Sequence, residues 1–210
     1  MVCFSVIKKN NPVNKIRTEV KKNKVPPKEP WLVQGLKLLE EEGPGAISID
    51  RLAALVGKSK GSFYFHFKSR NGYIEQLLAH YKTVSTANIQ EKIDQDLPQW
   101  DKLKKLTELI FNISSKQELA IRAWALYDPL AKTFQDDIDQ IRLAFIQDIY
   151  AETAKSPGDA RLTAHKNYAL YIGLQQIKHL HTEETFKVLL KSIFLPEDKP
   201  QTETERKGDL

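Results

Sequence analysis

Histidine and cysteine are the side chains that most often act as nucleophiles, proton carriers or metal ligands, and this sequence uses them sparingly. Cys3 is the only cysteine among 210 residues, which excludes an internal disulfide and a zinc site with several thiolates. No spacing joins a histidine to a serine, cysteine or carboxylate in the way that a nucleophile and its base require. His179 and His181 are two residues apart, which places them on different faces of a helix. We therefore expect no enzyme, no metal site and no cofactor from the five histidines, His66, His80, His165, His179 and His181.

The distribution of charge indicates a different chemistry. The first 28 residues contain eight Lys or Arg and one Glu, a net charge of +7, whereas the whole chain carries +5, so the remainder carries −2. A concentrated basic segment is typical of a protein with a polyanionic partner, although a solvated tail that keeps the chain soluble explains the same charge. Because apolar residues are sparse there, we expect residues 1–28 to form a disordered basic arm and residues 196–210 to form a polar tail.

Nothing in the sequence indicates a membrane partner. No segment approaches the roughly 20 consecutive apolar residues that cross a bilayer. The apolar start, Met1 to Ile7, lacks a preceding basic segment and meets Lys8 too early to be a signal peptide. We therefore expect a cytoplasmic protein.

The residues that follow the arm have the pattern of three short helices. The first begins at Pro30, a favourable residue for a first turn, and ends at Gly43-Pro44-Gly45. Ser48 and Ser59 have the side chain preferred at a helix N-cap, and each precedes a short amphipathic segment. Two short helices joined by about three residues, with Gly57 between them, predict a helix-turn-helix.

The rest of the chain is also predicted to be helical. A longer helix is expected from Ser69 to about residue 90, and further apolar repeats at helical spacing continue to Phe194. No alternating strand pattern of useful length occurs. The prediction is an all-α protein of about nine helices, with a three-helix helix-turn-helix domain at residues 29–75 and a larger domain for ligand binding and dimerisation at residues 76–195.

Residues 31–78 carry a more specific pattern. It consists of WLVQGLKLLEEEG from Trp31, SIDRLAALVG from Ser48, KSKGSFYFHFKSR from Lys58 and IEQLL from Ile74. This segment closely resembles the DNA-binding domain of the TetR family of bacterial regulators. The resemblance implies a homodimer that binds a palindromic operator in double-stranded DNA. It further implies a sequence-specific transcriptional repressor that a small-molecule inducer releases from that operator.

The resemblance also implies which residues meet DNA. A recognition helix presents small or polar residues at its N-terminal end, and Lys60 offers a long donor there while Gly61 allows close approach. Arg70 takes the position at which the family commonly has a phosphate-binding lysine, and its guanidinium suits phosphate oxygens. Phe63 and Phe67 are expected in the core instead. The residues expected to contact DNA are Ser48, Ser59, Lys60, Gly61, Ser62, Tyr64, His66 and Arg70.

The resemblance assigns two roles to the C-terminal region. The middle helices would surround an inducer, and the aromatic residues expected to line that cavity are Phe111, Trp124, Tyr127, Phe145, Tyr168 and Tyr171. The last two helices, near 159–180 and 183–194, would form a four-helix bundle with those of a second copy. The residues expected at this dimer interface are Leu170, Leu174, Ile177, Phe186, Leu189 and Ile193. Packing within one chain is the alternative for each of these residues.

Two departures from the family pattern support a second hypothesis. Asn71-Gly72-Tyr73 stands where the family usually has an acidic residue and a leucine, and Asp50 faces the expected DNA side. The alternative is therefore a ligand sensor or interaction protein on the same fold that has lost DNA binding. A third interpretation assigns nonspecific DNA binding to the arm. We also expect Asn71-Gly72 to permit movement of the fourth helix.

Overall fold

The computed structural model describes residues 27–195, and the part of the chain it describes contains helices but no strand. The predicted arm, apart from residues 27 and 28, and the predicted tail lie outside these residues. Helix α4 continues through a π-helical turn, η2, into α5, so that these three form one helix and nine separate α-helices result in the described range. The bounds are α1 (Glu29–Glu42), η1 (Pro44–Ala46), α2 (Ile49–Val56), α3 (Lys60–Phe67), α4 (Arg70–Lys82), η2 (Thr83–Ala87), α5 (Asn88–Gln90), α6 (Gln99–Phe111), α7 (Ser115–Ala125), α8 (Pro129–Ala151), α9 (Pro157–Gln176), η3 (Lys178–Leu180) and α10 (Glu183–Phe194). The prediction of an all-α fold with about nine helices is confirmed.

Serine caps start three consecutive helices. The Oγ atoms of Ser48, Ser59 and Ser69 each accept a hydrogen bond from the backbone N–H three residues later, at 3.3, 3.2 and 3.0 Å. These bonds satisfy N–H groups that have no partner inside the first turn of a helix. Gly57 ends α2 in the left-handed conformation, with φ of 66°. Local sequence therefore determines the ends of α2 and α3.

An aromatic cluster holds α1, α3 and α4 together. Phe63 and Phe67 are buried, and their rings lie 5.5 and 6.3 Å from the ring of Trp31 in edge-to-face contacts. The ring of Tyr73 lies 5.3 Å from that of Phe63 and 4.9 Å from that of Phe67. The expectation that Phe63 and Phe67 belong to the core is confirmed.

The unusual residues at the start of α4 fit the space around them. The Tyr73 hydroxyl donates to the backbone carbonyl oxygen of Trp31 at 2.9 Å, and a Cβ added to Gly35 would lie 1.9 Å from that hydroxyl. A Cβ at Gly72 would lie 2.5 Å from the carbonyl oxygen of Phe67. Gly35 and Gly72 thus give Tyr73 and the first turn of α4 room to pack closely. The expectation that Asn71-Gly72 permits movement of the fourth helix stays a prediction.

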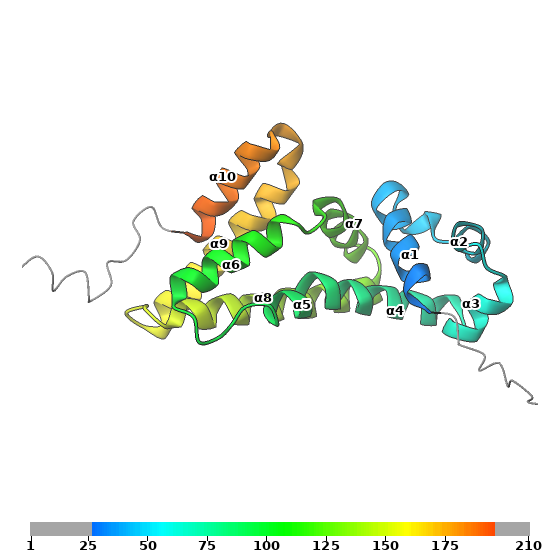
Figure 1. Ribbon diagram of the computed structural model, residues 1–210, viewed down its shortest axis with the longest axis horizontal. Coiled ribbons are helices and arrows are strands. Elements are labelled where there is room, and N and C mark those ends of the chain that lie inside the picture. Colours follow the sequence, from blue (N-terminus) through cyan, green and yellow to red (C-terminus); the bar gives the residue numbers. More distant parts are fainter. Residues whose placement is uncertain (1–26, 196–210) are drawn as a thin grey trace, which may run out of the picture.

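The helices form an elongated molecule in which α4–α5 and α8 run along the long axis (Figure 1). Helices α1 to α3 lie at one end, and α6, α9 and α10 lie at the other. The N-terminal core extends into the second half of the chain, because Ile121 of α7 and Ala131 and Ile138 of α8 belong to it. A second core lies between α6, α8, α9 and α10. Helix α4 therefore connects the small helical domain to the rest of the molecule.

Two classes of feature are missing from the described residues. None of their helices is both long enough and apolar enough to cross a membrane. Between residues 27 and 195 no group of three or more His, Cys, Asp or Glu side chains is placed to hold a metal ion.

Candidate nucleic-acid interface

Helix α3 separates its residues into two faces. Phe63, His66 and Phe67 are buried against the domain, whereas the opposite face is open to solvent. The exposed residues of α3 are Lys60, Gly61, Tyr64 and Phe65. A helix with an open face, anchored by aromatic residues on the other side, has the form needed to enter the major groove of DNA.

Lys60 forms an ion pair with Asp50 of α2. The hydrogen bond to this carboxylate, together with its negative charge, raises the pKa of Lys60. Both side chains are well exposed, so the pair joins α2 to α3 at the surface. The negative charge of Asp50, which is unfavourable on a DNA-binding surface, is therefore neutralised by Lys60.

Tyr64, Arg70 and the capping serines Ser48 and Ser59 carry exposed polar groups. The ring of Tyr64 packs edge-on against Phe63 at 5.6 Å, while about half of the side chain stays exposed. Arg70 is the first residue of α4 and is exposed. The exposed Ser48 and Ser59 use an Oγ lone pair for capping, which leaves each hydroxyl proton free to be donated to an anion. Ser62 is half-buried in the first turn of α3.

His66 departs from its expected role. Only 5% of the residue is exposed, and its Nε2 atom is buried and has no hydrogen-bond partner among the described residues. Its ring instead lies 5.2 Å from that of Phe65 and 5.9 Å from that of Phe67. Burial, aided by the positive charges of Lys28 and Lys68, lowers the pKa of His66. The prediction that His66 contacts phosphate is wrong for this conformation, because its ring is turned into the domain.

Phe65 was not among the expected DNA contacts, yet 57% of it is exposed. It follows Gly61 by one helical turn, so the two residues lie on the same outward face. The helical period of the sequence is the signal that could have predicted the exposure of Phe65. Once Phe63 and Phe67 are buried, Phe65 must point away from both of them.

A small cavity of about 30 Å³ lies where the second core meets the end of α4. Phe145, Tyr168 and Tyr171, three of the six aromatic residues expected to surround an inducer, line this cavity. Its polar lining comes from Ser85 and Thr86 of η2 and from Arg142 of α8, which the sequence did not single out. This volume holds about one water molecule.

Three other residues predicted for this cavity lie elsewhere. Phe111 packs against Phe186, with ring centroids 6.2 Å apart. Trp124 packs against the N-terminal core, and Tyr127 is 88% exposed. The prediction is wrong for these three residues, because aromatic type alone does not indicate which side of a helix meets a cavity.

Arg142 belongs to a buried network that joins the cavity to α4. Its Nε donates to Oγ1 of Thr86 at 3.0 Å, and one Nη donates to the backbone carbonyl oxygen of Ser85 at 3.3 Å. The other Nη donates to both carboxylate oxygens of Glu118, at 3.1 and 3.0 Å. Burial disfavours the charge on Glu118, but the positive charges of Arg142 and Arg122 hold its pKa below the usual value.

The network also contains a second ion pair. The two terminal nitrogens of Arg122 donate to the two carboxylate oxygens of Asp139, at 3.0 and 2.7 Å, and its Nε donates to Glu118 at 2.8 Å. Tyr168, which lines the cavity, donates to Asp139 at 2.7 Å. Two arginines and two carboxylates thus balance in charge where α7, α8, α9 and η2 meet.

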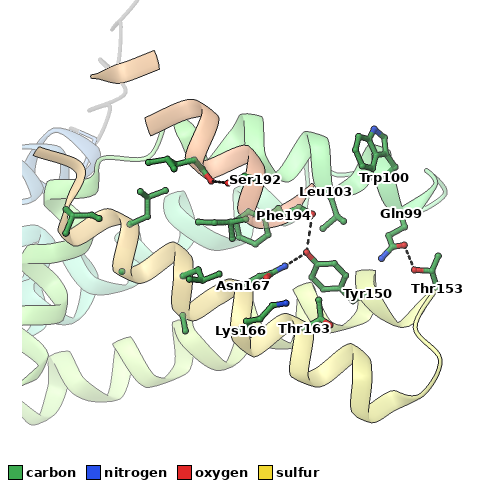
Figure 2. A pocket seen from close by; sticks show the side chains of 17 residues that line it. Gln99, Trp100, Leu103, Tyr150, Thr153, Thr163, Lys166, Asn167, Ser192 and Phe194 are labelled. Atoms are coloured by element: carbon green, nitrogen blue, oxygen red, sulfur yellow. Dashed lines mark hydrogen bonds between the residues drawn. The ribbon is translucent and has the colours of Figure 1, made fainter. Parts of the chain in front are cut away.

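An open groove of about 1160 Å³ occupies the far end of the molecule, between α6, α9 and α10 (Figure 2). Leu170 and Ile177 line it and are 51% and 44% exposed. Leu174, Leu189 and Ile193 also contribute to it, so five of the six residues predicted for the dimer interface lie together. Phe186 is the exception. It is buried beside Phe111, and this part of the interface prediction is wrong.

Polar side chains gather at one end of the groove. Asn167 donates to the Tyr150 hydroxyl at 2.7 Å, and this hydroxyl donates to the backbone carbonyl oxygen of Phe194 at 3.2 Å (Figure 2). These bonds attach α8 and α9 to the end of α10. The apolar part of the groove is thereby held on a rigid set of helices.

Comparisons with known proteins agree with this geometry. The family described as "Bacterial regulatory proteins, tetR family" matches residues 32–77, which include α2 and α3. A search of curated protein sequences finds no match.

Solved structures extend the likeness over most of the chain. Reduced Escherichia coli NemR superimposes with a TM-score of 0.68 at 18% identity, covering 82% of this chain and 99% of NemR. A putative TetR-family transcriptional regulator from Rhodococcus sp. gives a TM-score of 0.67 at 20% identity, covering 80% of this chain and 96% of that one. A putative transcriptional regulator from Saccharomonospora viridis, solved in complex with choline, gives 0.64 at 16% identity, covering 79% and 93%.

Residues 32–77 thus match the DNA-binding domain of the TetR family, and the described residues share the fold of solved TetR-family transcriptional regulators. Helices α2 and α3, with Gly57 between them, form the helix-turn-helix within the matched segment.

Proposed function

We propose that this regulator is a homodimeric repressor that binds a palindromic operator through α3 and is released by a small-molecule inducer. The observation that carries the proposal is the exposed face of α3 together with the apolar groove lined by residues of α9 and α10. Helix α3 lies at one end of the molecule, and α9 and α10 lie at the other (Figure 1). Two copies joined at the grooves would present two recognition helices to one duplex, which multiplies affinity.

The proposed DNA contacts divide by chemistry. Lys60, Gly61 and Ser62 occupy the first turn of α3 and would approach base edges. Tyr64 and Arg70, with the hydroxyls of Ser48 and Ser59, would donate to phosphate oxygens. Contacts of this second kind position the domain on the duplex without reading sequence.

The proposed dimer interface rests on exposed apolar side chains and on a gap between them. Leu170 of α9 and Ile177, which directly follows this helix, are exposed, and Gly173 lies between them with open space where a Cβ would be. Apolar patches of this kind on a soluble protein mark interaction sites. A missing side chain in the middle of the patch would let the helix of a second copy approach closely.

The proposed inducer site is the small cavity beside Arg142. An inducer needs more than about 30 Å³, so its entry would displace groups around η2, which continues the helix that begins at Arg70. A ligand acts only if it prefers this expanded geometry to the DNA-binding geometry. The solved neighbour that holds choline shows ligand binding in a protein of similar fold.

The test is the selection of bound sequences from a random pool of DNA duplexes, with a Tyr64→Ala, Arg70→Ala double variant as the control. We expect the wild type to enrich a palindrome and the double variant to lose this enrichment. Both substituted side chains are exposed, so the variant should retain the circular dichroism spectrum of the wild type.

The second candidate function is a sensor or interaction protein that no longer binds DNA. The ion pair between Lys60 and Asp50 favours it, because the pair neutralises a positive charge on the recognition helix. A wild-type chain that is dimeric in solution but enriches no sequence at low salt would support this function and contradict the proposed one.

A further inference from the structure

The ring of Phe65 is exposed on α3, and neither the proposed phosphate contacts nor the proposed hydrogen bonds to bases give it a role. Its aromatic neighbours two residues away on either side, Phe63 and Phe67, are fully buried. Phe65 instead occupies the middle of the outward face, directly opposite the buried residues of the helix. Among the described residues nothing covers more than about half of this side chain, so its ring is available to a partner.

A basic and an aromatic side chain lie beside the ring of Phe65. The Nζ of Lys68 lies 5.7 Å from the ring centroid and donates to the Phe65 carbonyl oxygen at 3.2 Å. The ring of His66 meets that of Phe65 edge-on at 5.2 Å. Lys58 precedes α3 and Arg70 begins α4, and both are exposed. An apolar ring within a basic rim matches a nucleic acid better than it matches an apolar protein surface.

Gly61 leaves the ring accessible from the direction of the helix N-terminus. A Cβ at this position would meet only the Oγ of Ser59, at 3.6 Å, so nothing in the fold requires glycine there. Phe65 is consequently the first bulky side chain on the middle of the outward face. When the helix enters a groove, its ring meets the groove floor before any other apolar group of that face.

The chemistry of the ring restricts what it can recognise. Phenylalanine has no donor or acceptor, so it can bind neither a phosphate nor the polar edge of a base. The apolar group on the floor of the major groove is the 5-methyl group of thymine, which no other base carries. We propose that Phe65 is a specificity-determining residue that reads a thymine in each operator half-site through this methyl group. The inference rests on the proposed function, in which α3 is the helix that enters DNA.

The test replaces each thymine of the selected operator by deoxyuridine, one pair of symmetric positions at a time. Deoxyuridine removes the methyl group and keeps the base pair. Affinities of the full chain for each duplex are measured by fluorescence anisotropy. At one position, loss of the methyl group should weaken wild-type binding about fourfold per half-site, as expected for one buried carbon.

Variants of Phe65 decide whether this residue is responsible. Phe65→Ala should bind the thymine and deoxyuridine duplexes equally well, whereas Phe65→Leu should keep most of the preference because it keeps an apolar surface. Tyr64→Phe serves as the matched control: it should weaken binding to both duplexes equally and leave their ratio unchanged.

Two results would overturn the inference. One is a wild type that is indifferent to every methyl group of its operator, and the other is a Phe65→Ala variant with the wild-type preference. The second result, with DNA binding otherwise weakened or intact, would assign the ring to a protein partner or to the DNA backbone. Failure of the wild type to select any operator would instead refute the proposed function, and this inference with it.

Discussion

The buried network around Glu118 gives the most quantitative prediction. Only 1% of this residue is exposed, and its carboxylate accepts hydrogen bonds from Arg142, Arg122 and Tyr81. Glu118→Gln keeps the shape but removes the charge, and it leaves Arg142 without a carboxylate partner among the described residues. Breaking a buried ion pair in this way costs about 3–5 kcal/mol of unfolding free energy.

That cost corresponds to a large fall in thermal stability. For a chain of this size each kcal/mol shifts Tm by about 2–4 °C, so Glu118→Gln should melt about 6–20 °C below the wild type. The assay is thermal and urea unfolding followed by circular dichroism at a fixed protomer concentration. Glu42→Gln, which breaks an exposed ion pair with Arg51, is the matched control and should stay close to the wild type.

A second substitution tests the cause of the loss. Arg142→Met replaces the orphaned guanidinium by an apolar side chain of similar length, so Glu118→Gln, Arg142→Met should be more stable than Glu118→Gln alone. Arg122 keeps its bonds to Asp139 in both variants. A loss below about 1 kcal/mol in the single variant, or a double variant less stable than the single one, would refute the argument that an unpaired buried charge causes the destabilisation.

Three further predictions follow from other parts of the molecule. Gly61→Ala should raise the unfolding free energy by up to about 1 kcal/mol in urea titrations, because alanine is the better helix former. The same substitution should lower the affinity for the operator. A higher affinity would contradict a close approach of Gly61 to DNA. Burial lowers the pKa of His66 below its ordinary 6.5, so as the pH falls the imidazole is protonated in the unfolded chain before it is protonated in the folded one, and the unfolding free energy decreases below about pH 6.5. His66→Gln should therefore lose less stability than the wild type between about pH 7.5 and about pH 5.5. An equal loss in both proteins would contradict the burial of a neutral His66. Leu170→Glu with Ile177→Glu should convert the dimer to a monomer in light scattering, whereas Val33→Glu on α1 should not; a dimer that survives the double substitution would place the interface elsewhere.

The helix boundaries were predictable because the signals that determine them are local. Ser48, Ser59 and Ser69 each cap the helix that the sequence assigned to them, and each cap depends on a backbone N–H three residues away. The buried positions of Phe63 and Phe67 follow from the helical period together with the aromatic residue type. Such features need only short-range information.

The features that escaped prediction depend on contacts between distant residues. His66 and Phe65 are adjacent and aromatic, and only the packing of α3 against its neighbours decides that one is buried and the other exposed. Arg142 has hydrogen-bond partners that are distant in sequence, among them Thr86 at 56 residues and Glu118 at 24 residues. Only the packing of α7, α8 and η2 against one another brings these residues together. Phe186 has the spacing of an interface residue, yet it fills a space within the chain beside Phe111.

The most direct test of the account is a salt titration of DNA affinity for the selected operator and a scrambled duplex, with wild type and Arg70→Ala. The wild type should bind the operator about 10³-fold or more tightly than the scrambled duplex, and its affinity for each duplex should fall as the salt concentration rises. Arg70→Ala should weaken both and reduce the salt slope by about 0.9 for each phosphate contact that is lost. A wild type without preference for either duplex, and without a salt slope, would contradict the central claim that the open face of α3 reads DNA.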